Sequence, residues 1–439
     1  MSASPSMLAL SVALCVANPC LSADPGPAGR IKHIVVLFQE NRTPDNLFHG
    51  LPGADIADSG VDSKGHVIPL APVPLVIDYD IDHRHADFLT MYHDGAMDGA
   101  DLIPTRCRTD VPQTTCYRPD APFKYVDPAD VAPYFELARG YTFGDRMFQS
   151  NQGPSFPAHQ YIISGTSTPS AGGAYDKTLA AENPLPANPT GCIESPPGEL
   201  VALIDPRGRE RLSIFPCFEH PVLMDLLKQA GHTWTYYTLR TGSIWTGPNA
   251  IRHLTQGDDW THVVVPPSRI LADIAAGRLT DVAWVIPPAG ASDHALEDKK
   301  GDGPSWVASV VNAIGESAYW NDTAIFVTWD DWGGWYDHVA PPIHSSYESG
   351  FRVPLIVVSP YAKKGYVSHV THSFGSILKF IEEAFDLPSL GYEDARSDDL
   401  ADCFDFRQAV MPHRRARSIH DAAYFLQQAA APLSEDDDY

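Results

Sequence analysis

The stretch Ile31-Lys32-His33-Ile34-Val35-Val36-Leu37-Phe38 is the clearest strand in the chain, and Glu40-Asn41-Arg42 follows it almost directly. Its near-continuous aliphatic run is typical of a parallel strand that is buried on both faces. In an open α/β sheet, functional groups collect where the strands end. This stretch therefore predicts a central strand with polar, functional side chains at its carboxyl end.

Other elements repeat this pattern along the chain. Strands separated by helices indicate an α/β protein whose mostly parallel sheet is covered on both faces. Three stretches rich in Pro, Gly, Asp and Ser, at about 50–78, 98–127 and 169–216, are expected as long functional loops. Further strands are expected at 281–286, 323–329 and 353–358, and helices at 128–139, 157–163, 222–230, 305–314 and 372–385.

The composition limits the partners of this protein. The chain has 439 residues, enough for one large α/β domain or two smaller ones, and its formal net charge is -24. That charge repels nucleic acid and anionic lipid surfaces, so we expect no nucleic-acid partner. It would also repel a phosphate ester, so a phosphate substrate would require a bound cation, most simply a divalent metal ion.

The N-terminus resembles a secretory signal. An apolar run at 7–17 is followed by Leu21-Ser22-Ala23, which predicts a signal peptide at 1–23, although no Lys or Arg precedes the run. The run is too short to span a bilayer, and no other stretch approaches the ~20 apolar residues that a membrane helix needs. We therefore expect a secreted or periplasmic protein without a transmembrane anchor.

The cysteines fit an oxidising compartment. Pairs that are close in sequence, Cys107 with Cys116 and Cys192 with Cys217, are the simplest disulfides, although spacing alone cannot fix connectivity. Cys403 is left over. No pair has CxxC spacing, which argues against a structural zinc site built on thiolates.

Two polar pairs follow predicted strands. Asp330 and Asp331 follow the strand at 323–329, and Gly333-Gly334 lets the chain turn so that both carboxylates can reach one site. Either this pair or Glu40 with Asn41 could instead be a solvated loop or a cap. Carboxylate and amide oxygens together suit a hard divalent ion. Four aromatic residues around the aspartates indicate partial burial, which requires a cation or hydrogen-bond donors: Trp329, Trp332, Trp335 and Tyr336.

Ser155 and several histidines are candidates for chemistry. Ser155 precedes a predicted helix N-terminus, where free N–H groups favour an alkoxide and a bound phosphate, although an ordinary N-cap is the alternative. His294 and His338 follow strand ends and could donate a proton to a leaving oxygen. His83 lies in a polar loop and could be functional or structural.

These pieces, in this order, resemble the bacterial phosphoesterase family that contains non-specific phospholipases C and a respiratory-burst-inhibiting acid phosphatase. The resemblance runs from about Lys32 to about Phe385. It rests on 34–48, on Gly153-Pro154-Ser155-Phe156-Pro157 with Ser164-Gly165-Thr166, on Ser292-Asp293-His294 and on 328–339.

The resemblance implies an alkaline-phosphatase-like three-layer α/β sandwich with a mostly parallel central sheet and long inserted loops, as a catalytic domain at 30–400 with a C-terminal extension and acidic tail at 401–439. It implies a divalent metal ion and a phosphate-ester small molecule or phospholipid headgroup as substrate. The oxygen-rich ligands favour calcium, magnesium or manganese, and iron or zinc are the alternatives. The short C-terminus favours the phosphatase-like branch. The implied roles are metal ligation by Glu40, Asn41, Ser155, Asp330 and Asp331, a nucleophilic Ser155, and active-site histidines His83, His294 and His338.

Three alternatives remain. A sulfatase is similar in its Ser-x-Pro-x-Arg pattern, but His159 stands where the Arg would be. A metal-free serine esterase would need the second Gly of the nucleophile elbow, which is missing after Ser155. A secreted, non-catalytic binding protein on this scaffold would have no reason to retain the whole ligand set.

Overall fold

The computed structural model describes Met1 and residues 26–107, 116, 118–175, 177–185, 189–193, 198–296 and 300–428. Apart from Met1, the expected signal peptide at 1–23 lies outside these residues, as does the acidic tail at 434–439. No helix in the described part of the chain is long and apolar enough to cross a membrane.

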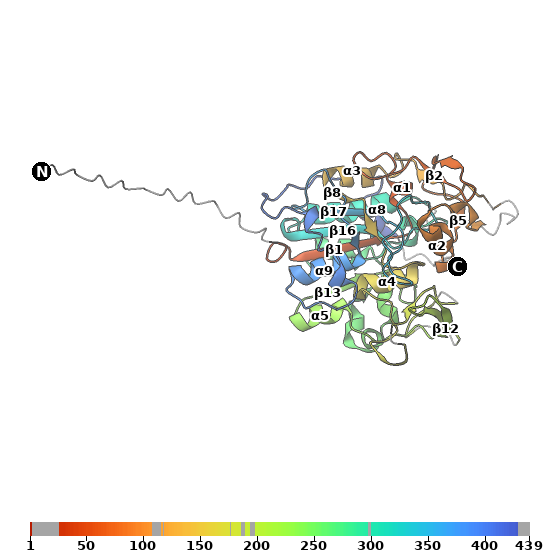
Figure 1. The fold of residues 1–439 in the computed structure, drawn as a ribbon. Coiled ribbons are helices and arrows are strands. Elements are labelled where there is room, and N and C mark those ends of the chain that lie inside the picture. The colour runs from red at the N-terminus through yellow and green to blue at the C-terminus, as the bar shows by residue number, and fades with distance from the viewer. Residues whose placement is uncertain are drawn as a thin grey trace.

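An eight-stranded sheet forms the centre of the protein, in the order β14-β13-β15-β1-β16-β17-β8-β18 (Figure 1). Only β17 runs antiparallel to its neighbours, so the expected mostly parallel sheet is confirmed. The strands are β14 (Val263–Val264), β13 (Trp234–Tyr237), β15 (Val282–Val285), β1 (His33–Gln39), β16 (Thr323–Trp329), β17 (Leu355–Val358), β8 (Thr142–Gly144) and β18 (Tyr366–Ser368).

Helices cover both faces of this sheet, as the alternation of side chains on β1 shows. Phe38 packs with its ring 5.1 Å from Phe374 of α9 and 4.9 Å from His159 of α4. The next residue, Gln39, points to the other face and donates to the hydroxyl of Tyr134 in α3 at 3.2 Å. The three-layer α/β arrangement follows from these opposite contacts.

Most of the expected helices form within a few residues of their predicted bounds. The helix expected at 157–163 begins earlier, at Ser155, and the one expected at 372–385 loses His372 and Ser373 to a short strand that pairs with β9. The helices are α1 (Pro44–Leu47), α2 (His85–Tyr92), α3 (Ala132–Gly140), α4 (Ser155–Ser164), α5 (Leu223–Ala230), α6 (Arg252–Gln256), α7 (Arg269–Ala275), α8 (Gly303–Gly315), α9 (Phe374–Ala384) and α10 (Ala422–Gln427).

The long loops carry small sheets of their own. Both disulfides expected from spacing are present, Cys107–Cys116 and Cys192–Cys217, and Cys403 is a buried free thiol. The short strands are β2 (Ser59–Val61), β3 (Val67–Pro69), β4 (Ala71–Val73), β5 (Tyr79–Ile81), β6 (Thr105–Cys107), β7 (Lys124–Val126), β9 (Met147–Phe148), β10 (Leu179–Ala180), β11 (Val201–Ile204), β12 (Glu210–Ile214) and β19 (His372–Ser373).

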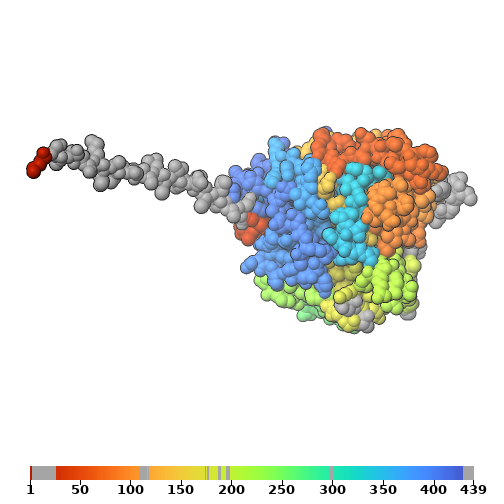
Figure 2. Space-filling model, viewed as in Figure 1, coloured from red at the N-terminus to blue at the C-terminus, as the bar shows by residue number. Residues whose placement is uncertain are grey.

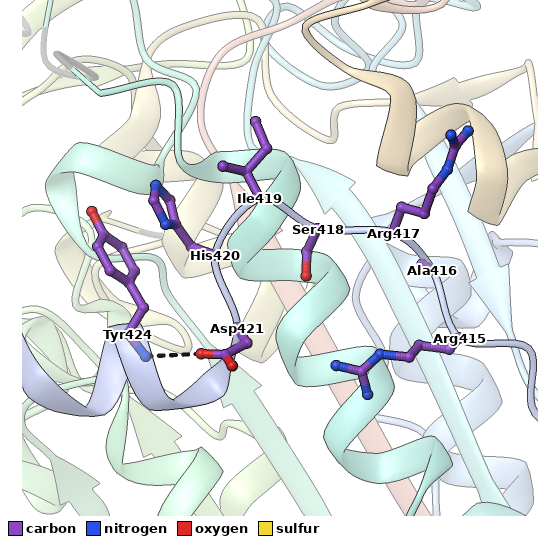
Figure 3. Close-up of a pocket in the computed structure, with 8 residues that line it drawn as sticks. All are labelled: Arg415, Ala416, Arg417, Ser418, Ile419, His420, Asp421 and Tyr424. Atoms are coloured by element: carbon purple, nitrogen blue, oxygen red, sulfur yellow. Dashed lines mark hydrogen bonds between the residues drawn. The ribbon is translucent and has the colours of Figure 1, made fainter.

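The C-terminal segment lies along α8 and joins the main core (Figure 3). Asn312 of α8 holds it by donating to the carbonyl of Ala416 and accepting from its N–H, both at 2.9 Å. Asp421 then caps α10 by accepting from the N–H of Tyr424 at 3.1 Å. Phe425 packs into the same hydrophobic cluster as the central sheet, so residues 413–428 are an integral part of the folded unit.

Candidate active site

The carboxyl ends of two neighbouring strands bring the candidate ligands together. Gln39 at the end of β1 lies opposite Trp329 at the end of β16, so Glu40 and Asp330 leave the sheet side by side. The backbone N–H of Asn41 donates to Oδ1 of Asp330, and its Nδ2 donates to Oδ1 of Asp331, both at 3.1 Å. All four side chains are buried, so the solvated-loop alternative does not describe either pair.

A glycine allows these two turns to approach. Gly333 has φ +61°, and a Cβ at this position would lie 2.6 Å from the carbonyl oxygen of Asn41. Its N–H donates to Oδ1 of Asp331 at 2.7 Å, which fixes that carboxylate. The expected turn after Asp331 therefore has a steric reason as well as a conformational one.

Ser155 is the first residue of α4, and its side chain faces Glu40 and Asp331. Pro154, not Ser155, is the N-cap, and no side chain caps the helix from that position. Oγ of Ser155 lies 3.4 Å from Oε2 of Glu40 and 3.3 Å from Oδ2 of Asp331. The helix N-terminus adds partial positive charge at this point. A buried hydroxyl between two carboxylates is an unusual environment for a purely structural serine.

His159 is a site residue that the sequence did not single out as functional. Its Nε2 lies 3.1 Å from Oε1 of Glu40, and both side chains are fully buried. One ligand atom from each of Glu40, His159 and Asp330 lies within 4.8 Å of the other two. The available signal was the spacing of four residues from Ser155, which places both side chains on one face of a helix.

The donor set fits a divalent cation. Three fully buried carboxylates, from Glu40, Asp330 and Asp331, converge here, and burial of like charges is costly unless a cation compensates it. Oδ1 of Asn41 is buried and accepts no hydrogen bond from the described residues. Carboxylate, amide and imidazole ligands together are suited to a divalent metal ion.

His83 joins this cluster through Asn41. Its Nε2 lies 3.1 Å from Nδ2 of Asn41, and its Nδ1 lies 2.8 Å from the carbonyl oxygen of Ile81. A proton on Nδ1 satisfies both contacts, because the ring then donates to the carbonyl and accepts from the amide. His85, two residues further along the chain, has its Nδ1 2.6 Å from Oε1 of Glu210 instead, so His83 is the one of the two that contacts the ligand set.

His294 lies beside His83. The two ring centroids are 6.1 Å apart, and Nδ1 of His294 lies 2.5 Å from the carbonyl oxygen of Ala295. The ring centroid of Trp245, from the loop after β13, also lies 6.1 Å from that of His294. The structure thus brings His83 and His294 to the same edge of the sheet as the ligands.

His338 lies in a different group. Its Nδ1 is 2.8 Å from Oδ2 of Asp45, its Nε2 is 3.1 Å from Oδ1 of Asp55, and Arg352 approaches from the side. Burial alone would lower the pKa of His338, but the hydrogen bond and charge of Asp45 outweigh it and raise the pKa to about 9. Its hydrogen bonds in the described structure are to this network and not to Ser155.

Arg42 and Asp293 shape the turn that presents His294. Nε and Nη2 of Arg42 donate to the carbonyl oxygen of Asp293 at 2.9 and 2.7 Å. The Asp293 carboxylate accepts from the hydroxyl of Tyr134 at 2.7 Å and from Nε1 of Trp329 at 3.1 Å. Complete burial raises the pKa of Asp293 to about 6 despite these donors. The sequence did not predict these two roles.

Comparison with known proteins gives a consistent result. The model of the Phosphoesterase family matches residues 31–388. "Phospholipase C B" of Mycobacterium tuberculosis (strain ATCC 25618 / H37Rv) is 25% identical over 468 residues, which cover 91% of this chain and 81% of that protein. "Non-hemolytic phospholipase C" of Pseudomonas aeruginosa is 23% identical, covering 91% of this chain and 61% of that protein.

A solved structure of a protein in the alkaline phosphatase superfamily from Vibrio parahaemolyticus is also similar. It has a TM-score of 0.38 and 11% identity, and the match covers 85% of this chain and 72% of that one.

Proposed function

The chain belongs to the Phosphoesterase family and is a phosphoric ester hydrolase, and from this premise we propose that it cleaves phosphate mono- or diesters through a phosphoserine intermediate on Ser155, in a site that holds a divalent metal ion. The observation that supports this proposal most directly is the position of the Ser155 hydroxyl, 3.4 Å from Glu40 and 3.3 Å from Asp331. The hydroxyl has one proton and can donate it to only one of the two carboxylates. We take this arrangement to favour loss of that proton when Ser155 attacks.

The residues that would hold the ion are Glu40, Asn41, Ser155, Asp330, Asp331 and His159. A bound divalent ion supplies positive charge, which lowers the pKa of a nearby hydroxyl and offsets the charge of a phosphate. Asn41 also links this group to His83 through its Nδ2, which fixes the imidazole beside the place where a phosphate would lie.

The remaining steps belong to the protein's own side chains. Ser155 passes its proton to a neighbouring carboxylate and attacks phosphorus in line with the leaving alcohol. We assign protonation of the leaving oxygen to His294, since the contacts of His338 lie with Asp45 and Asp55. Water then attacks the phosphoserine and releases phosphate or a phosphomonoester.

The relatives and the disulfides support proposals for the substrate class and for the cellular location of the protein. Relatives of this chain are named phospholipase C, so phospholipid headgroups and small phosphate esters are both proposed substrates. Two disulfides persist only in an oxidising compartment, which supports a secreted or periplasmic protein.

Paired chromogenic substrates test the proposal. Nitrophenyl phosphate and nitrophenyl phosphorylcholine are each assayed with and without chelator, on wild type and on Ser155→Ala. The variant should lose activity by on the order of a thousandfold or more. Ser164→Ala is the matched control, because Ser164 lies at the other end of α4, where its hydroxyl is within hydrogen-bonding distance of the carbonyl oxygens of Gln160 and Thr166. Full activity of Ser155→Ala would show that the mechanism is wrong.

A further inference from the structure

One inserted segment of this chain exposes apolar side chains close to the proposed nucleophile. Leu185, Leu200 and Phe215 are 57%, 47% and 41% exposed. All three lie between residues 185 and 215, in and beside the small sheet β10-β11-β12. Clustered exposed apolar side chains mark an interaction surface, whereas single ones do not.

The pairing of the strands makes these three side chains contiguous. Leu185 and Leu200 exchange both backbone hydrogen bonds, at 3.0 and 3.2 Å, so they stand directly opposite each other. Val201 pairs with Ile214 as the outermost pair of β11 and β12, and that register, continued one residue beyond the paired strands, would set Leu200 opposite Phe215. Residues directly opposite share a face of the sheet. Leu185, Leu200 and Phe215 therefore form one cross-strand row, which we call the apolar row.

The segment that leads into Leu185 contacts the first turn of α4. Oδ1 of Asn183, two residues before Leu185, accepts from the N–H of Phe156 at 2.9 Å, and Phe156 directly follows Ser155. The carbonyl of Ala181 accepts from the hydroxyl of Tyr347 at 2.7 Å, close to Gly153. Figure 1 shows β12 at the lower right of the molecule, and the yellow-green part of the chain occupies the lower right in Figure 2.

We propose that the apolar row docks the enzyme on the surface of a zwitterionic phospholipid aggregate. This inference rests on the proposed function, and it specifies which substrate form reaches Ser155. A net charge of -24 opposes anionic lipid, which leaves a surface of zero net charge as the favourable one. Two exposed arginines before and on β12, Arg207 and Arg211, are suited to the phosphate groups of such a surface, whereas Arg209 is paired with Asp205.

Vesicle binding and hydrolysis are the test. Full-length wild type and the triple variant Leu185→Gln, Leu200→Gln, Phe215→Gln are sedimented with phosphatidylcholine vesicles and assayed on the same vesicles and on soluble nitrophenyl phosphorylcholine. The triple variant should bind and hydrolyse vesicles at least about tenfold less well, because three apolar side chains are no longer buried in lipid. Its rate on the soluble ester should be unchanged.

Leu212→Gln is the matched control. Leu212 is 55% exposed on the same sheet, but it stands opposite the buried Leu203, on the face away from the apolar row. This variant should behave as wild type. Equal vesicle binding by the triple variant, no vesicle binding by wild type, or a wild-type dimer that the triple variant dissociates in light scattering would each overturn the docking surface. Wild type that binds vesicles but hydrolyses neither substrate would refute the catalytic proposal and leave the surface standing.

Discussion

Oε1 of Glu40 lies 3.1 Å from Nε2 of His159, while Oε2 of the same carboxylate lies 3.4 Å from Oγ of Ser155. Ser155 and His159 are one turn apart on α4, so a single glutamate from the end of β1 faces two functional groups of one helix. Glu40 therefore joins α4 to the sheet edge through two contacts, and one of them places an imidazole beside the proposed metal site.

Replacing His159 should weaken the metal site without removing the nucleophile. We expect His159→Gln to lower the affinity for the divalent ion by about tenfold to a hundredfold, with a matching loss of activity at limiting metal that excess metal partly restores. Metal content after dialysis, together with activity against metal concentration, measures this. His253→Gln, on the surface of α6, is the control. If the His159 variant binds the metal as tightly as wild type does, His159 is not a ligand.

Removal of the metal should destabilise the fold as well as stop turnover. Without a cation, three buried carboxylates repel one another in a low-dielectric environment. A ligand at about a hundred times its dissociation constant stabilises a protein by about 3 kcal/mol, so the melting temperature should rise when the right ion is returned to chelated enzyme. Thermal unfolding with calcium, magnesium, manganese, iron or zinc, added singly, would identify it. An unchanged melting temperature with every ion would contradict a metal at this site.

His338 should make stability depend on pH. Its pKa in the folded protein is about 9, above the ordinary value of about 6.5, so folding favours the protonated ring. The stabilisation is therefore fully present below about pH 6.5 and is lost as the pH rises through 9. His338→Gln should cost ~1–3 kcal/mol near pH 6 and much less near pH 10.

Urea unfolding of wild type and His338→Gln at several pH values measures this difference. A difference that stays constant from pH 6 to 10 would show that His338 is not charged in the folded state. The soluble ester assay on the same variant separates stability from catalysis. If His338 only stabilises the network of Asp45 and Asp55, turnover by the folded variant should stay close to that of wild type.

The peptide that contains Ser155 distinguishes a phosphoesterase from a sulfatase. We expect its mass to correspond to unmodified serine in resting enzyme, because His159 takes the place of the Arg in the sulfatase pattern. Rapid quenching of wild type during turnover should reveal one added phosphoryl group on this peptide. An aldehyde at Ser155 would instead favour the sulfatase reading.

Much of the fold could be predicted from the sequence, because long aliphatic strands and capped helices are local signals. The strand at 31–38 and the turn residues after it, the glycine that closes α5 and both disulfides are as expected. The strand expected at 353–358 forms as β17 and is the one strand of the central sheet that runs antiparallel to its neighbours, since strand direction depends on the path of the connections. The short strand β13 was missed because its sequence, Trp-Thr-Tyr-Tyr, lacks the aliphatic run that marked the predicted strands.

The sequence by itself determined which residue types could perform the chemistry: Glu40 with Asn41, Asp330 with Asp331, and Ser155 before a helix. It could not determine which histidines join them. His83 and His85 are two residues apart, yet only one contacts Asn41, because side-chain direction depends on the packing of a loop. His338 follows a strand, as His294 does. Its ring, however, contacts Asp45 and Asp55, which lie nearly three hundred residues away in sequence. Only the tertiary structure brings such distant charges together, and those charges decide whether an imidazole is positioned for proton transfer or held in an ion pair.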